Sequence, residues 1–185
     1  GILLIHDLGH SLTSLATKVQ QSYPYFIPFP VVFGSLGSVV FLRSEPPHRS
    51  ALLRMAAMGP IAGMVAAVPI AAYGLSQSLP LEVTEVPPGA TWLGNSLLCT
   101  WLAEWFSPNG IDVQLHPLAL AGWVAMFITS INLLPAAQLD GGHIAHALFG
   151  RGAVVVSIVT VAGLFVYGIY LTLDTSYGAY AGVPW

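Results

Sequence analysis

The chain has 185 residues, of which 55% are hydrophobic and only 7% charged, with a formal net charge of -3. Soluble domains carry about 25% charged residues, so this composition excludes an ordinary soluble domain and predicts an integral membrane protein in a lipid bilayer. The small, scattered charge gives no basic surface for nucleic acid.

The chain opens with the apolar stretch GILLIHDLGHSL, Gly1–Leu12, which includes two histidines and an aspartate. Only five residues precede His6, whereas a membrane-spanning helix needs about 20. We therefore expect the first helix to begin upstream. The chain is then one domain, residues 1–185, truncated at its N-terminus.

The next segment, YPYFIPFPVVFGSLGSVVFLR, is not typical of a helix. Its first part has three prolines in seven residues, and proline interrupts helical hydrogen bonding. The β-branched and aromatic runs around GSLG predict a short β-hairpin over Val31–Leu42. Lipid cannot satisfy the polar backbone of such a segment, so we expect a membrane-embedded hairpin covered by protein.

Three further segments are apolar enough to span a membrane: Met55–Leu75, Leu118–Leu139 and Ala153–Leu173. Pro135 is expected to shorten the second of these at its far end. With the helix of His6 and His10, the sequence predicts a mainly α, polytopic fold with about four transmembrane helices. In GPIAG, Gly59 and Gly63 stand four apart, a spacing typical of close helix packing.

A shorter apolar segment, Leu93–Phe106, contains Glu104 and two tryptophans. These features predict an interfacial helix along the membrane surface, between the second and third spanning helices. If this segment does not cross, all basic residues share one face, which the positive-inside rule makes cytoplasmic. These residues are Lys18, Arg43, Arg49, Arg54 and Arg151.

His6 and His10 stand four positions apart, so a helix would place both imidazoles on one face. Two such nitrogens can bind one metal ion, and neutral imidazole suits zinc. The alternative is that each histidine only hydrogen-bonds a neighbouring helix. His143 and His146 are possible further ligands, or simply polar residues at a cytoplasmic helix start.

A catalytic zinc usually has three protein ligands and an open position for water. Asp140, in SINLLPAAQLDGGH, is the best candidate for the third ligand, because Pro135 ends regular helix and Gly141 and Gly142 permit turns. Intramembrane carboxylates are costly and usually mark function. The competing interpretation is an aspartate that caps the next helix.

HDLGH combined with NLLPAAQLDG resembles the site-2 protease family of intramembrane zinc metalloproteases, in the branch without a large soluble insert. The family signatures are HExxH and N-x-x-P-x-x-x-L-D-G, and the second is matched in full, from Asn132 to Gly141. The resemblance extends from Gly1 to about Tyr170 and includes the PYFIPFP and GPIAG stretches.

The resemblance implies that His6, His10 and Asp140 bind Zn²⁺ and that Asn132 positions the substrate backbone or the developing oxyanion. Asp7 takes the place of the family's general base, which is glutamate. Its side chain is one methylene shorter, and a misplacement of about 1 Å can cost about a hundredfold in rate.

The implied activity is hydrolysis of peptide bonds in or near transmembrane segments of membrane-anchored regulatory proteins, as in regulated intramembrane proteolysis. A catalytically impaired pseudoprotease that binds membrane clients, or a metal transporter, is the alternative. We expect a bacterial inner membrane, or else a plastid-type membrane, with the active site nearer the cytoplasmic side. The sequence does not fix the oligomeric state.

Overall fold

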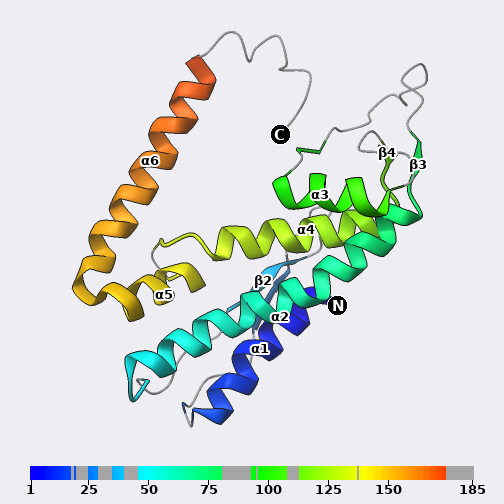
Figure 1. Cartoon of the computed structure of the whole chain (residues 1–185). Coiled ribbons are helices and arrows are strands. Elements are labelled where there is room, and N and C mark those ends of the chain that lie inside the picture. Colours follow the sequence, from blue (N-terminus) through cyan, green and yellow to red (C-terminus); the bar gives the residue numbers. More distant parts are fainter. Residues whose placement is uncertain are drawn as a thin grey trace. The chain divides into compact units, whose positions relative to one another are not determined.

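The computed structural model is mainly helical (Figure 1). It describes residues 1–17, 19, 25–28, 35–39, 46–80, 93–94, 96–107, 113–136 and 138–173. The helices are α1 (Ile2–Ala16), α2 (Arg49–Ser76), α3 (Leu97–Phe106), α4 (Pro117–Asn132), α5 (Asp140–Phe149) and α6 (Ala153–Leu173), with a 3-10 turn at Gly150–Gly152. The strands are β1 (Tyr25–Pro28), β2 (Ser35–Val39), β3 (Leu79–Pro80) and β4 (Val113–Gln114).

The chain forms two compact units. The first comprises residues 1–68 and 124–160, and the second comprises residues 69–123 and 161–185. The candidate ligands from both ends of the chain, His6, His10 and Asp140, all belong to the first unit. The candidate site therefore lies within that unit alone.

Two described stretches are long and apolar enough to cross a membrane, judged by length and composition: Arg49–Ser76 and Asp140–Leu173. α6 has the predicted limits, and α2 contains the predicted Met55–Leu75 but begins at Arg49. α4 stops at Asn132, before Pro135, which agrees with the shortening expected from that proline. Its 16 residues are fewer than the roughly 20 that a span needs, so the number of four spanning helices stays a prediction.

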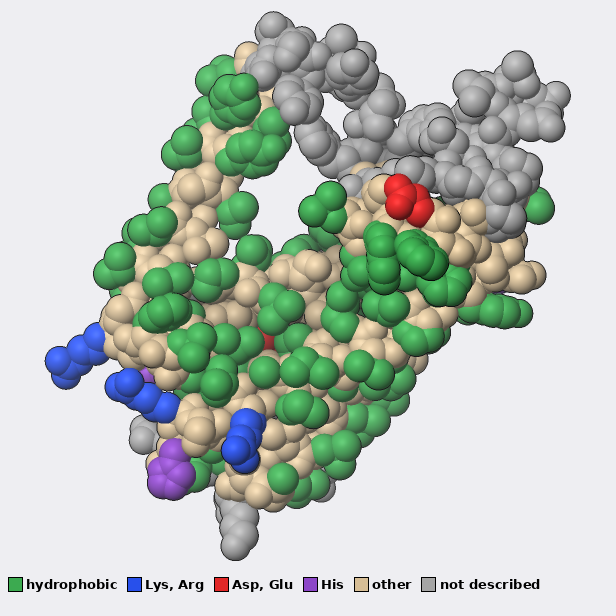
Figure 2. All heavy atoms as spheres, in the orientation of Figure 1, with side chains coloured by type: hydrophobic (Ala, Val, Ile, Leu, Met, Phe, Trp, Pro, Cys, Tyr) green, Lys and Arg blue, Asp and Glu red, His purple; other side chains and the backbone are tan. Residues whose placement is uncertain are grey.

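The surface of α1 is the reverse of a water-soluble helix. Its buried residues are His6, Asp7, Gly9 and Ser14, while Leu4, Leu8, Leu12 and Leu15 are each between 47% and 74% exposed. A soluble protein turns the apolar face of a helix inward. Figure 2 shows hydrophobic side chains over much of the visible helical surface. This arrangement suits a solvent of lipid tails.

Small residues dominate the buried apolar positions. Most of the buried hydrophobic residues are alanines, including Ala51, Ala56, Ala125 and Ala145 in the first unit. Small side chains let helix backbones approach closely, which is how membrane helices associate without a hydrophobic driving force. In α1 an added Cβ at Gly9 would meet the carbonyl oxygen of Met58 and the Cβ of Ala62, so α1 packs closely against α2.

β1 and β2 form an antiparallel pair with Tyr25 opposite Val39 and Phe26 opposite Ser38. The predicted hairpin limits, Val31–Leu42, are wrong. β1 lies before them and ends at Pro28, whereas the predicted GSLG turn mostly falls inside β2. Proline cannot donate to a strand ladder, and the register shifts between Phe26 and Pro28. The connection, residues 29–34, lies outside the described residues.

The second unit contains α3, which begins at Leu97 rather than at Leu93. Ser96 is its N-cap and accepts a hydrogen bond from the backbone N–H of Cys99. Trp101 and Trp105 are 55% and 72% exposed, as the interfacial prediction requires, but the position of α3 at a membrane surface stays a prediction. β3 and β4 pair antiparallel in the same unit.

Candidate metal centre

Two imidazoles from α1 meet on its buried side. His6 and His10 are one helical turn apart, and their ring centroids are 4.9 Å apart. The two Nε2 atoms are 3.2 Å apart. The i, i+4 spacing therefore brings the two nitrogens together as the sequence predicted.

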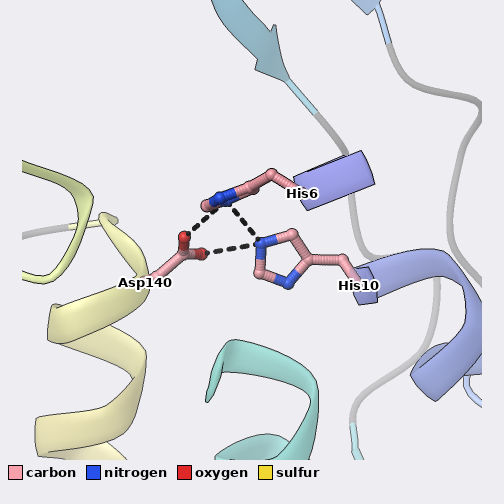
Figure 3. A group of neighbouring side chains, drawn as sticks. All are labelled: His6, His10 and Asp140. Atoms are coloured by element: carbon pink, nitrogen blue, oxygen red, sulfur yellow. Dashed lines mark hydrogen bonds and ion pairs between the residues drawn. The ribbon is translucent and has the colours of Figure 1, made fainter. Parts of the chain in front are cut away.

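Asp140 reaches the same point from a distant part of the sequence. α4 ends at Asn132, and α5 begins at Asp140 after a short connection. One carboxylate oxygen, Oδ2, lies 3.2 Å from Nε2 of His6, and Oδ1 lies 3.4 Å from Nε2 of His10 (Figure 3). The helix-capping interpretation is wrong, because Leu139 is the N-cap residue and no side chain makes a cap hydrogen bond.

The connection before α5 determines where Asp140 lies. An added Cβ at Gly141 would overlap the carbonyl oxygens of Leu133 and Leu134. The first turn of α5 is thus in direct contact with the backbone that follows α4. Only a glycine allows this approach, and it directs the preceding carboxylate toward α1.

The donor atoms of His6, His10 and Asp140 all lie within 4.8 Å of one another. Zinc bonds of about 2.0–2.1 Å that meet at tetrahedral angles put neighbouring ligand atoms roughly 3.3 Å apart. The measured separations of 3.2, 3.2 and 3.4 Å match that value. These residues therefore fit a small divalent cation.

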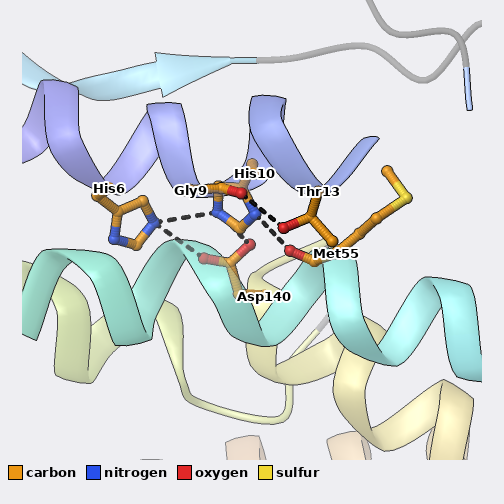
Figure 4. Close-up of polar contacts among 6 residues, drawn as sticks. All are labelled: His6, Gly9, His10, Thr13, Met55 and Asp140. Atoms are coloured by element: carbon orange, nitrogen blue, oxygen red, sulfur yellow. Dashed lines mark hydrogen bonds and ion pairs between the residues drawn. The ribbon is translucent and has the colours of Figure 1, made fainter. Parts of the chain in front are cut away.

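The orientation of His10 also fits a metal ligand. Its Nδ1–H donates to the carbonyl oxygen of Met55, at 2.7 Å (Figure 4). A neutral imidazole held in this way presents its Nε2 lone pair to the cluster, where it faces a carboxylate oxygen of Asp140. Two acceptors at this distance need a cation or a proton between them. Backbone carbonyls commonly orient metal-binding histidines in this manner.

Asp7 is 7% exposed, and its Oδ2 has no hydrogen-bond partner in the described part of the chain. It directly follows His6 on α1. A buried acceptor without a partner is costly, and in native proteins such atoms usually have a ligand, water or catalytic role. Asp7 is thus a buried carboxylate, next to His6 in the sequence, whose Oδ2 has no partner among the described residues.

The two glycines of GPIAG lie against the two imidazoles. An added Cβ at Gly59 would overlap the ring of His10, and one at Gly63 would lie 3.0 Å from Nδ1 of His6. That Nδ1 is buried without a partner among the described residues. The sequence suggested simple helix packing for this pair. The shared i, i+4 spacing of the glycines of α2 and the histidines of α1 indicates a close approach of two helices, but it does not identify the imidazoles as the groups in contact.

The remaining predicted residues lie outside the cluster. Asn132 is the last residue of α4, and no hydrogen bond between its side chain and the three candidate ligands is present in the described region. His143 and His146 are on α5. Neither belongs to the one group of candidate metal ligands found among the described residues. The hydrogen bond to the Met55 carbonyl could not be predicted from the sequence, because every residue has a backbone carbonyl.

The sequence of the chain matches a known protein family. The model of peptidase family M50 matches residues 1–171. The chain belongs to peptidase family M50. The predicted membership of the site-2 protease family is thereby confirmed, and zinc is the cofactor that the names of its relatives give.

The relatives include "Probable zinc metalloprotease EGY1, chloroplastic" from Arabidopsis thaliana, which is 35% identical over an alignment of 184 residues. That alignment covers 94% of this chain and 33% of the relative. "Probable zinc metalloprotease EGY2, chloroplastic" from the same plant is 30% identical over 154 residues, 81% of this chain and 27% of the relative. The chain is also 31% identical over 154 residues to the Arabidopsis "DDT domain-containing protein PTM", covering 77% of this chain and 9% of that protein.

This chain spans about a third or less of the length of these relatives. No solved structure matches it significantly.

Proposed function

We propose that this chain is the catalytic part of an intramembrane zinc metalloprotease. Its substrates would be peptide bonds in or next to transmembrane segments of membrane-anchored regulatory proteins. The observation that carries the proposal is the convergence of His6, His10 and Asp140, whose donor atoms lie within 4.8 Å of one another. Membership of peptidase family M50 supplies the reaction class.

In this proposal His6, His10 and Asp140 would hold the zinc ion through their clustered nitrogen and oxygen atoms. When bound, zinc lowers the pKa of its water toward about 7 and polarises the scissile carbonyl. The chain's own contribution is positional. Met55 fixes the ring of His10 through its carbonyl, and Gly141 lets α5 begin where the carboxylate of Asp140 reaches both imidazoles.

Asp7 is the proposed general base. It takes the proton from the attacking water and delivers it to the leaving nitrogen. Its buried, unpartnered Oδ2 supports this role, because a carboxylate already saturated with hydrogen bonds would accept a proton poorly. Asn132 is proposed to hold the substrate backbone or the oxyanion, on the basis of the family pattern alone.

A substrate helix must unwind before it can be cut, because its carbonyls are engaged in internal hydrogen bonds. In lipid the freed polar groups need new partners. We propose that the pair β1–β2 offers an open strand edge to the unwound segment, which binds as an added strand. The antiparallel pairing of Tyr25–Pro28 with Ser35–Val39 supports this role.

The site is proposed to lie nearer the basic face of the membrane protein. The described basic residues are Arg49 and Arg54 at the start of α2 and Arg151 beyond α5. Figure 2 shows these three Arg side chains gathered at one end of the first unit. The named relatives are chloroplastic rather than bacterial, so we propose a plastid-type membrane in place of the bacterial inner membrane.

One observation favours a second function, a pseudoprotease that binds clients without cutting them. Asp7 stands where the family signature has glutamate, and its shorter side chain reaches about 1 Å less far.

Cleavage of a transmembrane substrate in proteoliposomes tests the proposal, with the parent chain, Asp7→Glu and Asp7→Ala compared at equal zinc content. We expect the parent to cut and Asp7→Ala to lose about 10²- to 10⁴-fold in rate, the usual contribution of a general base. Asp7→Glu should equal or exceed the parent, by up to about a hundredfold. Cleavage by Asp7→Glu with none by the zinc-loaded parent would establish the pseudoprotease instead.

A further inference from the structure

α2 lies against the candidate metal centre and has a glycine at each of two positions that contact the imidazoles. Gly59 and Gly63 stand four residues apart on α2, as His6 and His10 do on α1. An added Cβ at Gly59 would overlap the Nε2 edge of the His10 ring. One at Gly63 would lie 3.0 Å from Nδ1 and 3.2 Å from Cβ of His6. Each glycine therefore makes room for one imidazole.

The two glycines differ in which atom they accommodate. Nε2 of His10 is a donor atom of the cluster, 3.2 Å from Nε2 of His6 and 3.4 Å from Oδ1 of Asp140. Nδ1 of His6 is not a donor atom of the cluster. A methyl group at 59 would collide with the ligand nitrogen itself, whereas one at 63 would only be crowded. The requirement for glycine is thus stricter at 59.

The turn of α2 between Met55 and Gly59 holds the His10 ring at two places. The carbonyl of Met55 accepts the Nδ1–H of the ring at 2.7 Å, and in an α-helix the same carbonyl accepts the N–H of Gly59. The ring is therefore in contact with this turn at both of its edges. Nδ1 is fixed by the carbonyl of Met55, and Gly59 lies against the other edge of the ring. Nε2 faces Nε2 of His6 and Oδ1 of Asp140 (Figure 4).

We propose that Gly59 is a positioning residue for the metal ligand His10, and that its missing side chain is required for zinc binding rather than for helix packing alone. The inference rests on the proposed function. Gly9 provides the contrast, because its added Cβ would meet the carbonyl oxygen of Met58 on the α2 backbone and no imidazole among its nearest atoms. Gly9 thus allows α1 and α2 to pack closely, whereas Gly59 makes room for the ring of His10.

Metal affinity is the first readout. Zinc and cobalt titrations of the purified full chain in detergent would compare the parent, Gly59→Ala and Gly163→Ala. Gly163 is the control, since it also lies inside a helix and an added Cβ there meets nothing within 4 Å. We expect Gly59→Ala to weaken metal binding about 10- to 100-fold, the range for residues that orient ligands, and to alter the cobalt spectrum. Gly163→Ala should match the parent.

Stability of the metal-free protein is the second readout, because a purely structural glycine would behave differently. Gly59→Ala should lower the unfolding midpoint when His10 is present. In the His10→Ala background the ring is gone, so the same substitution should cause no loss. Unchanged metal affinity, or an equal loss of midpoint in both backgrounds, would overturn the proposal while leaving zinc binding by the parent intact. Failure of the parent itself to bind zinc would overturn the proposed function and this inference together.

Discussion

At the scale of single residues, the site combines polar atoms that an apolar protein would otherwise avoid. His6, Asp7 and Asp140 are buried or half-buried, and Nδ1 of His6 and Oδ2 of Asp7 have no partner among the described residues. Unpaired polar atoms of this kind are expensive in a low-dielectric interior. Their presence beside a cation-sized group of donor atoms is the mark of a functional site rather than of a structural one.

A residue-scale prediction concerns Gly141, which lets α5 begin against the backbone after α4. Gly141→Ala should push that backbone contact apart and move Asp140, because the carbonyl of Leu133 cannot rotate away as a side chain can. A displacement of about 1 Å would lower the cleavage rate about a hundredfold. Cleavage assays and zinc content would measure the effect. The matched control is Gly152→Ala, whose Cβ would have an ordinary 3.6 Å contact with Phe149; equal activity of both variants would refute this role.

Much of the site could be predicted from residue spacing alone. The spacing of four residues from His6 to His10 puts both on one helical face. The Asn132–Gly141 pattern indicates the end of a helix followed by a carboxylate. The role of the Met55 carbonyl could not be predicted, because backbone acceptors have no sequence signature. The contact of Gly59 with His10 was also out of reach, since glycine spacing alone indicates only that some helix approaches closely.

At the scale of elements, the sequence predicts a continuous helix better than the point where it ends. The charge-free segment Ala153–Leu173 became α6 with the same limits. α4 ends at Asn132, before Pro135, as that proline predicts, although the exact last residue was not predicted. The N–H of Leu134 bonds to the carbonyl of Ile131, three residues back. The strand pair also differs from the prediction, because β1 covers Tyr25–Pro28 and lies before the predicted range Val31–Leu42. Long-range pairing, not local propensity, decides which residues face each other in a sheet.

An element-scale prediction concerns β1–β2. Replacing residues 25–39 with a flexible Gly/Ser segment of equal length should abolish cleavage of a transmembrane substrate, because the unwound backbone would have no edge to pair with. Zinc content should stay at the parent value, since none of the three ligands comes from this segment. Mass spectrometry of the products and metal analysis would measure both.

An unstructured soluble peptide with the same cleavage sequence is the control for that experiment. It needs no unwinding in lipid, so the variant should still cut it at close to the parent rate. Undiminished cleavage of the transmembrane substrate would rule out strand addition. Loss of cleavage for both substrates would show that the segment supports the centre itself.

At the scale of the whole molecule, the chain turns apolar side chains outward and gathers polar ones inside its first unit. Leu4, Leu8, Leu12 and Leu15 of α1 and most of the described residues of α6 are exposed, so lipid is the solvent that makes this fold favourable. Two candidate ligands come from the first ten residues and the third from residue 140. Zinc would therefore link segments that are far apart in sequence, and binding it should stabilise the folded chain.

Zinc stoichiometry combined with X-ray absorption of the purified chain tests the central claim most directly. We expect one zinc ion per chain with two imidazole nitrogens and a carboxylate oxygen at about 2.0–2.2 Å. His6→Ala, His10→Ala and Asp140→Ala should each lower the stoichiometry and the zinc-dependent rise in the unfolding midpoint. A chain that takes up no zinc, or an Asp140→Ala variant that binds it with unchanged affinity and the same ligand shell, would contradict the account.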